Sequence, residues 1–158
     1  MIFERPKPPR NLFLCETDRI ENLPLLMKDS WTRYCLLLLI DARPIESENL
    51  SRIASRLTGS GLVCFCAWGP DCKRVHDLFD EGAMEANLAL TGDDVIMTTW
   101  HAEESLGETL WDFVHSTFPT EGLEIGCNDW IVACIGNEVW SREIRRIAHD
   151  AVYHPPKE

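Results

Sequence analysis

The sequence lacks the short motifs that identify several common enzyme classes. It contains no G-x-G-x-x-G after a strand, no G-x-x-x-x-G-K-[ST], no G-x-S-x-G and no H-E-x-x-H. These absences argue against a dinucleotide-dependent enzyme, a P-loop NTPase, an α/β-hydrolase and a zinc protease. There is also no C-x-x-C pair, which argues against a zinc site. We therefore predict neither a bound metal nor a cofactor.

Long apolar runs are also missing. Runs such as Cys35–Ile40 are far shorter than the roughly 20 residues that a membrane-spanning helix needs. The first residues, Met1–Pro6, contain no apolar core of the kind found in signal peptides. We therefore expect a cytoplasmic protein that does not enter membranes.

Basic residues are few for a chain of this length. Lys and Arg number 15 against 26 Asp and Glu, which gives a formal net charge of −11. Such a surface repels phosphate backbones, so it argues against nucleic acid and anionic membranes as partners. It is compatible with a basic protein partner, with a bound cation, or simply with high solubility. The sequence does not indicate an oligomeric state.

Cysteine, in contrast, is abundant. The seven cysteines are Cys15, Cys35, Cys64, Cys66, Cys72, Cys127 and Cys134. Their number is odd, and most lie within apolar runs, where a thiol behaves as a small buried hydrophobic group. This distribution favours a reducing compartment over a disulfide framework.

Prolines mark both ends of the chain. Three prolines and three basic residues within Glu4–Asn11 are incompatible with a helix or an inner strand. We predict a flexible arm over residues 1–11, one α/β domain over residues 12–153 and a short tail over residues 154–158. Within the domain, Leu12–Cys15 is a candidate edge strand.

The central part of the chain alternates between apolar runs and helical patterns. The four apolar runs are Cys35–Ala42, Gly61–Trp68, Val95–Trp100 and Trp130–Ile135. Runs of this kind are typical of strands buried on both faces, and amphipathic helical patterns separate them. The order predicts a three-layer α/β sandwich. Its mostly parallel open sheet would have at least four strands with helices on both faces, as in Rossmann-like or flavodoxin-like folds.

In such a sheet, ligands bind beyond the carboxyl ends of the strands. The residues that follow the predicted strands are therefore candidates for a ligand site, although every sheet of this kind also has a polar rim of caps and turns. The predicted ligand-binding residues are Trp68, Asp71, His76, Trp100, Glu103, Glu104 and Asn137. Asp41, Asp71, Glu103 and Glu104 could instead gather around Mg²⁺, but acids at helix starts already have a structural use.

Cys72 is the candidate nucleophile of an alternative, enzymatic interpretation. It falls in the first turn of a predicted helix, where the helix dipole stabilises a thiolate. His101 or His76 could act as the base, and Asp41 could orient it. The competing interpretation is that Cys72 packs against the apolar face of its own helix.

Two stretches resemble a known family. They are AWGPDC with VHDLFDE, within residues 67–81, and VIMTTWHAEESL with LW, within residues 95–111. They resemble a family of small bacterial proteins catalogued only as a domain of unknown function, over roughly residues 35 to 150. The resemblance implies a bacterial, cytosolic protein and implies no activity or catalytic residue.

Two classes of function follow from these observations. The first is an interaction or ligand-binding module that holds a basic protein partner or a small ligand at the strand ends. The second is a small cysteine-dependent hydrolase or transferase that uses Cys72, His101 and Asp41. The absence of any catalytic motif favours the first.

Overall fold

Five parallel strands form one open sheet. The computed structural model describes residues 11–153, with side chains up to Ala148, so the predicted N-terminal arm up to residue 10 and the C-terminal tail lie outside the described residues. The strands are β1 (Asn11–Thr17), β2 (Tyr34–Leu39), β3 (Leu62–Trp68), β4 (Met97–His101) and β5 (Asp129–Ile135). Their order across the sheet is β1-β5-β2-β3-β4, and every neighbouring pair is parallel.

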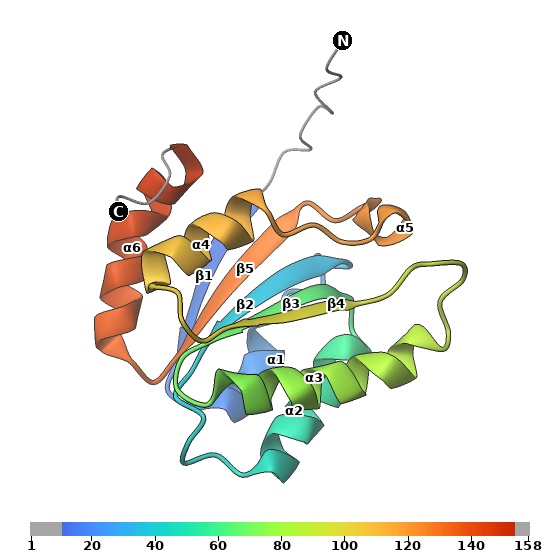
Figure 1. The fold of residues 1–158 in the computed structure, drawn as a ribbon, viewed down its shortest axis with the longest axis horizontal. Coiled ribbons are helices and arrows are strands. Elements are labelled where there is room, and N and C mark those ends of the chain that lie inside the picture. The colour runs from blue at the N-terminus through green and yellow to red at the C-terminus, as the bar shows by residue number, and fades with distance from the viewer. Residues whose placement is uncertain (1–10, 154–158) are drawn as a thin grey trace.

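Helices cover both faces of this sheet (Figure 1). A 3₁₀ turn, η1 (Ile20–Asn22), and helices α1 (Leu23–Leu26), α2 (Ser47–Thr58) and α3 (Cys72–Asn87) lie on one face. Helices α4 (Leu106–His115) and α6 (Glu138–Tyr153) cover the other, and α5 (Glu121–Glu124) is a single turn before β5. The predicted three-layer α/β sandwich is therefore confirmed.

The central strands are apolar because both of their faces are buried. All six residues of β2 are buried. Leu36 and Leu38 pack toward α2 and α3, whereas Leu37 and Leu39 pack toward α4 and α6. Successive side chains of a strand point to opposite faces, so β2 supplies both cores and no alternating polar position is left.

Four local predictions differ from the structure. The run Val95–Trp100, predicted as a strand buried on both faces, forms the edge strand β4 over Met97–His101, and most of its residues are exposed or half-buried because no strand covers its outer side. Helix α4 starts at Leu106, not at the acidic pair Glu103 and Glu104, because Ser105 is its N-cap and its hydroxyl accepts a hydrogen bond from the Glu108 backbone N–H. The sequence also predicts a loop over Gly122–Gly126, whereas the structure has the one-turn helix α5 at its start. The edge strand β1 runs to Thr17, two residues beyond the predicted strand.

Tyr34, the first residue of β2, predicts that the fold loses stability at alkaline pH. The Tyr34 side chain is buried, its hydroxyl lies 3.4 Å from the Ser60 hydroxyl, and burial raises its pKa to about 12. An unfolded tyrosine ionises near pH 10, so between about pH 10 and 12 only the unfolded state loses this proton. Stability present below pH 10 should therefore fall by up to roughly 2.7 kcal/mol over this range.

Tyr34→Phe cannot ionise, so its free energy of unfolding should fall less steeply than that of the wild type across the same pH range. Urea denaturation at pH 9 and pH 11.5 measures the difference. Equal losses in the two proteins would show that Tyr34 does not carry the effect.

Within the described residues, no helix combines the length and the apolar character needed to cross a membrane.

Candidate functional site

The carboxyl ends of the five strands lie at one edge of the sheet, at the lower left of Figure 1. After β1 and β2 the chain continues on the α1–α3 face, whereas after β5, which lies between them, it continues into α6 on the opposite face. The connections therefore diverge around β5. Parallel sheets form ligand-binding crevices where neighbouring connections diverge in this way.

A pocket of about 400 Å³ occupies this position, and we call it the switch-point pocket. Its residues come from the segments after β1, after β2 and after β5. They are Asp18, Arg19, Ile20, Glu21, Ile40, Asp41, Pro44, Ile45, Ile135, Gly136, Asn137 and Trp140. The volume lies in the range of small-molecule sites. The predicted location of the site, at the strand carboxyl ends, therefore coincides with a concave surface.

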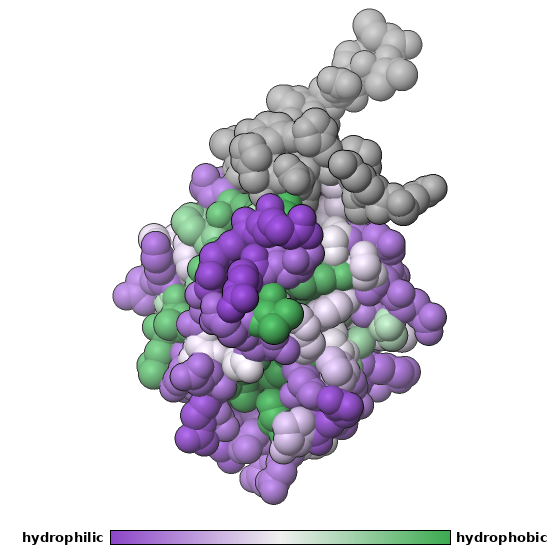
Figure 2. Space-filling model, turned by 90° about the vertical axis from the view of Figure 1, so that its left-hand side faces the viewer, coloured by the Kyte–Doolittle hydropathy of each residue, from purple (hydrophilic) through white to green (hydrophobic). Residues whose placement is uncertain are grey.

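A second hollow adjoins the first, with a volume of about 560 Å³. The two share Asp18, Gly136 and Asn137. The second hollow adds two carboxylates, Glu16 and Glu138. This side of the molecule faces the viewer in Figure 2, where mostly hydrophilic residues surround smaller hydrophobic areas.

Carboxylates outnumber guanidinium groups in the switch-point pocket. Asp18, Glu21 and Asp41 line it together with one cation, Arg19. Arg19 Nε lies 3.5 Å from a carboxylate oxygen of Glu21. Asp18 makes no ion pair with any residue that the structure describes. The pocket therefore contains one carboxylate without a positive neighbour bound to it.

Asp41, a predicted site residue, does lie in this pocket but is held by Arg43. The Arg43 side chain donates two hydrogen bonds to the carboxylate, of 2.9 and 2.7 Å. These hydrogen bonds lower the pKa of Asp41. Asp41 therefore remains ionised in mildly acidic solution.

Asn137, another predicted site residue, also lines the pocket. Its side-chain oxygen accepts a hydrogen bond of 3.0 Å from the Trp140 backbone N–H, so it caps the start of α6. The cap fixes the start of α6 and with it the position of Trp140, whose ring makes an edge contact with Trp68 at 5.0 Å between centroids. Trp68 therefore supports the pocket through Trp140.

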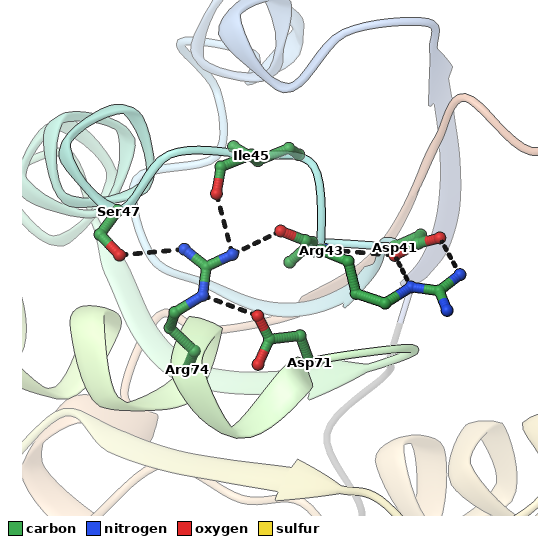
Figure 3. Close-up of polar contacts among 7 residues, drawn as sticks. Asp41, Arg43, Ile45, Ser47, Asp71 and Arg74 are labelled. Carbon is green, nitrogen blue, oxygen red and sulfur yellow. Dashed lines mark hydrogen bonds and ion pairs between the residues drawn. The ribbon is translucent and has the colours of Figure 1, made fainter.

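Arg74 fixes the pocket wall that follows β2 (Figure 3). From the first turn of α3 its guanidinium donates to the backbone oxygens of Ala42 and Ile45. It also donates to the Ser47 hydroxyl at 3.0 Å and to the carboxylate of Asp71, a predicted site residue, at 2.7 Å. One side chain thus joins the β2–α2 loop to the start of α3.

The remaining predicted residues lie around the ends of β3 and β4. The Trp68 indole donates a hydrogen bond of 3.0 Å to the Glu104 backbone oxygen. His76 lies against β4, with Nε2 3.1 Å from the Thr98 hydroxyl and its ring 4.5 Å from the Trp100 ring. Glu103 is exposed in the turn before α4. None of these side chains lines the switch-point pocket.

Of the three predicted catalytic residues, the structure brings only two together. The backbone N–H of His101 interacts with the Cys72 sulfur. The His101 side chain points to Glu104, with Nδ1 3.7 Å from a carboxylate oxygen. No contact within the described residues joins the Asp41 carboxylate to Cys72 or His101, because Arg43 binds it.

Cys72 itself is packed. Its side chain is 3 % exposed and lies in the same core as Val75 and Phe79. Burial raises the pKa of its thiol, although backbone N–H groups at the helix start act in the opposite direction. The helix start therefore favours the thiolate as expected, but desolvation outweighs this effect, so the net shift of the Cys72 pKa is upward.

The four acids considered for Mg²⁺ do not form a cluster. Among the side chains that the structure describes, no group of three or more His, Cys, Asp or Glu residues could hold a metal ion.

Sequence reasoning missed the residues contributed by the β1–η1 segment, above all Asp18, and also Arg74. The sequence signal of the β1–η1 segment is weak, because β1 is a half-buried edge strand and its pattern extends over few apolar residues. The order of strands places Asp18 beside Asn137, and no local pattern reports that order.

Comparisons with known proteins give a family and no activity. A family model described as "Domain of unknown function (DUF7684)" matches residues 12–151. No curated protein and no solved structure matches the chain.

Proposed function

We propose, for a chain that belongs to the DUF7684 family, that it is a binding protein for small organic cations held in the switch-point pocket. One observation carries the proposal. The carboxylate of Asp18 has no ion-pair partner among the described residues and lies where the two hollows meet. A ligand with an ammonium group would supply the missing positive charge.

The other lining residues support the same class of ligand. Ile20, Ile45 and Trp140 form an apolar wall beside the carboxylates, and an indole ring favours a nearby cation. An amine with a short apolar body therefore fits better than an anion, which the pocket's carboxylates and the net charge of −11 would repel. A concave site of this size favours a small ligand over a protein surface.

Phenethylamine and 3-phenylpropionate are suitable probes, because they have similar apolar bodies and opposite charges. In NMR titrations at neutral pH, phenethylamine should shift the backbone amide signals of Ile20, Gly136 and Asn137, and 3-phenylpropionate should not. Asp18→Asn should weaken the binding of phenethylamine about tenfold, which corresponds to loss of about 1.4 kcal/mol.

The matched control is Asp93→Asn, which removes the same charge from an exposed turn before β4, at the opposite edge of the sheet. It should leave the affinity unchanged. If Asp93→Asn and Asp18→Asn weakened phenethylamine binding equally, the loss of affinity would reflect the net charge of the protein and not the position of Asp18. Absence of binding by phenethylamine at millimolar concentration would refute the proposal.

A further inference from the structure

Four thiols lie together on the face of the sheet that α4 and α6 cover. Cys35 is on β2, Cys64 and Cys66 are on β3, and Cys127 comes two residues before β5. All four side chains are at most 3 % exposed. The Cys35 sulfur contacts those of both Cys64 and Cys127. None of the four lines the switch-point pocket.

One contacting pair in this cluster, Cys35 and Cys127, includes a residue that lies outside the strands. The sulfurs of Cys35 and Cys127 are 3.8 Å apart, and a disulfide requires about 2.05 Å. Cys35 and Cys64 are direct partners in the β2–β3 ladder, which fixes their backbones. Cys127 instead lies in the turn before β5, where its N–H donates to the Glu124 backbone oxygen at 3.0 Å, and it follows Gly126, at which an added Cβ would meet no atom within 4 Å. Small rotations in that turn can bring the two sulfurs together.

The hydrogen bonding also favours this pair. Hydrogen bonds from Cys35 lower the pKa of both Cys127 and Cys64, whereas burial raises the pKa of Cys35. A thiolate is the form that reacts with oxidants. Because the ladder holds Cys64 and Cys127 lies outside it, we take Cys127 as the attacking thiol and Cys35 as the resolving thiol.

We propose that Cys35 and Cys127 form a reversible disulfide when the protein meets hydrogen peroxide. The Cys127 sulfur attacks one peroxide oxygen, the O–O bond breaks, and sulfenic acid and one water form. The Cys35 sulfur then attacks the Cys127 sulfur, and the sulfenic hydroxyl leaves with the Cys35 proton as a second water. Each sulfur loses one electron and the peroxide gains two. Both sulfurs are buried, so a small uncharged oxidant is required.

The test uses the full chain with Cys15→Ser, because Cys15 is the one cysteine of the seven that is not buried. After treatment with peroxide, two of the six remaining thiols should resist alkylation in denaturant. Mass spectrometry of the digest should show peptides containing Cys35 and Cys127 joined to each other, and dithiothreitol should separate them.

Cys127→Ala should keep all of its thiols reactive to alkylation after the same treatment. Cys134→Ala removes another buried thiol from the same face and should still form the linked peptides. A linkage between Cys35 and Cys64, sulfinic acid at Cys127 without a linkage, or unchanged thiols in the Cys15→Ser protein would each overturn the proposal. These three outcomes are all measured in the Cys15→Ser protein. They therefore test the proposal even if Cys127→Ala fails to fold.

Discussion

The Gly69→Ala variant should lose about 4 kcal/mol or more of its free energy of unfolding, enough to unfold a marginal domain. Gly69 has a φ of 121°, a conformation that side-chain-bearing residues rarely adopt, and an added Cβ would lie 2.1 Å from the Ile40 backbone oxygen. That oxygen cannot move away, because the Ile40 N–H donates to the Trp68 backbone oxygen at 3.1 Å. The clash would therefore separate β2 from β3 at the edge that carries the pocket.

Gly92→Ala is the matched control. Gly92 also has a positive φ, of 68°, but nothing lies within 4 Å of the position its Cβ would take. It should lose only about 1 kcal/mol, the cost of the left-handed conformation itself. Urea denaturation followed by tryptophan fluorescence compares the two variants. Similar losses would mean that contact with Ile40 adds nothing to conformational strain.

The fold could be predicted because its three central strands, β2, β3 and β5, are buried on both faces. A run such as Leu36–Leu39 leaves no polar position, so the sequence itself reports a strand with a layer on each side. The spacing of Leu110, Phe113 and Val114 likewise reports the buried side of α4. Both patterns lie within short stretches of the chain, so they can be recognised in a single sequence.

The site could be predicted only in part, because it depends on the order of the strands. Asp41 and Asn137 lie at the switch-point pocket because β2 and β5 are neighbours. Asp18 joins them because β1 pairs with β5, 118 residues away along the chain at the pair Asn11 and Asp129. No local sequence pattern indicates either of these strand pairings. Cys72 and His101 instead follow β3 and β4, beyond β2 in the sheet.

Arg74→Ala should lower the free energy of unfolding by about 2–4 kcal/mol, because it leaves several polar groups without their partner. The affected groups are the backbone oxygens of Ala42 and Ile45, the Ser47 hydroxyl and the Asp71 carboxylate. Arg74→Lys keeps the charge but presents a single ammonium group, so it should recover less than half of the loss. Arg52→Ala is the control: it breaks an exposed pair with Glu48 and should cost less than about 0.5 kcal/mol.

Urea denaturation measures these losses, and hydrogen exchange at residues 42–46 locates them. If Arg74→Lys matched the wild type in both, the planar fork of the guanidinium would not matter.

The same variants separate support of the pocket from contact with its ligand. Arg74 does not line the pocket, whereas Ile45, whose backbone oxygen it holds, does. Arg74→Lys should therefore weaken phenethylamine binding together with stability, because the wall becomes mobile before the ligand arrives and must be ordered again on binding. Asp18→Asn should weaken binding at unchanged stability, since its carboxylate has no ion-pair partner among the described residues. If Asp18→Asn bound phenethylamine more weakly and also had a lower free energy of unfolding, Asp18 would instead be a residue that stabilises the fold.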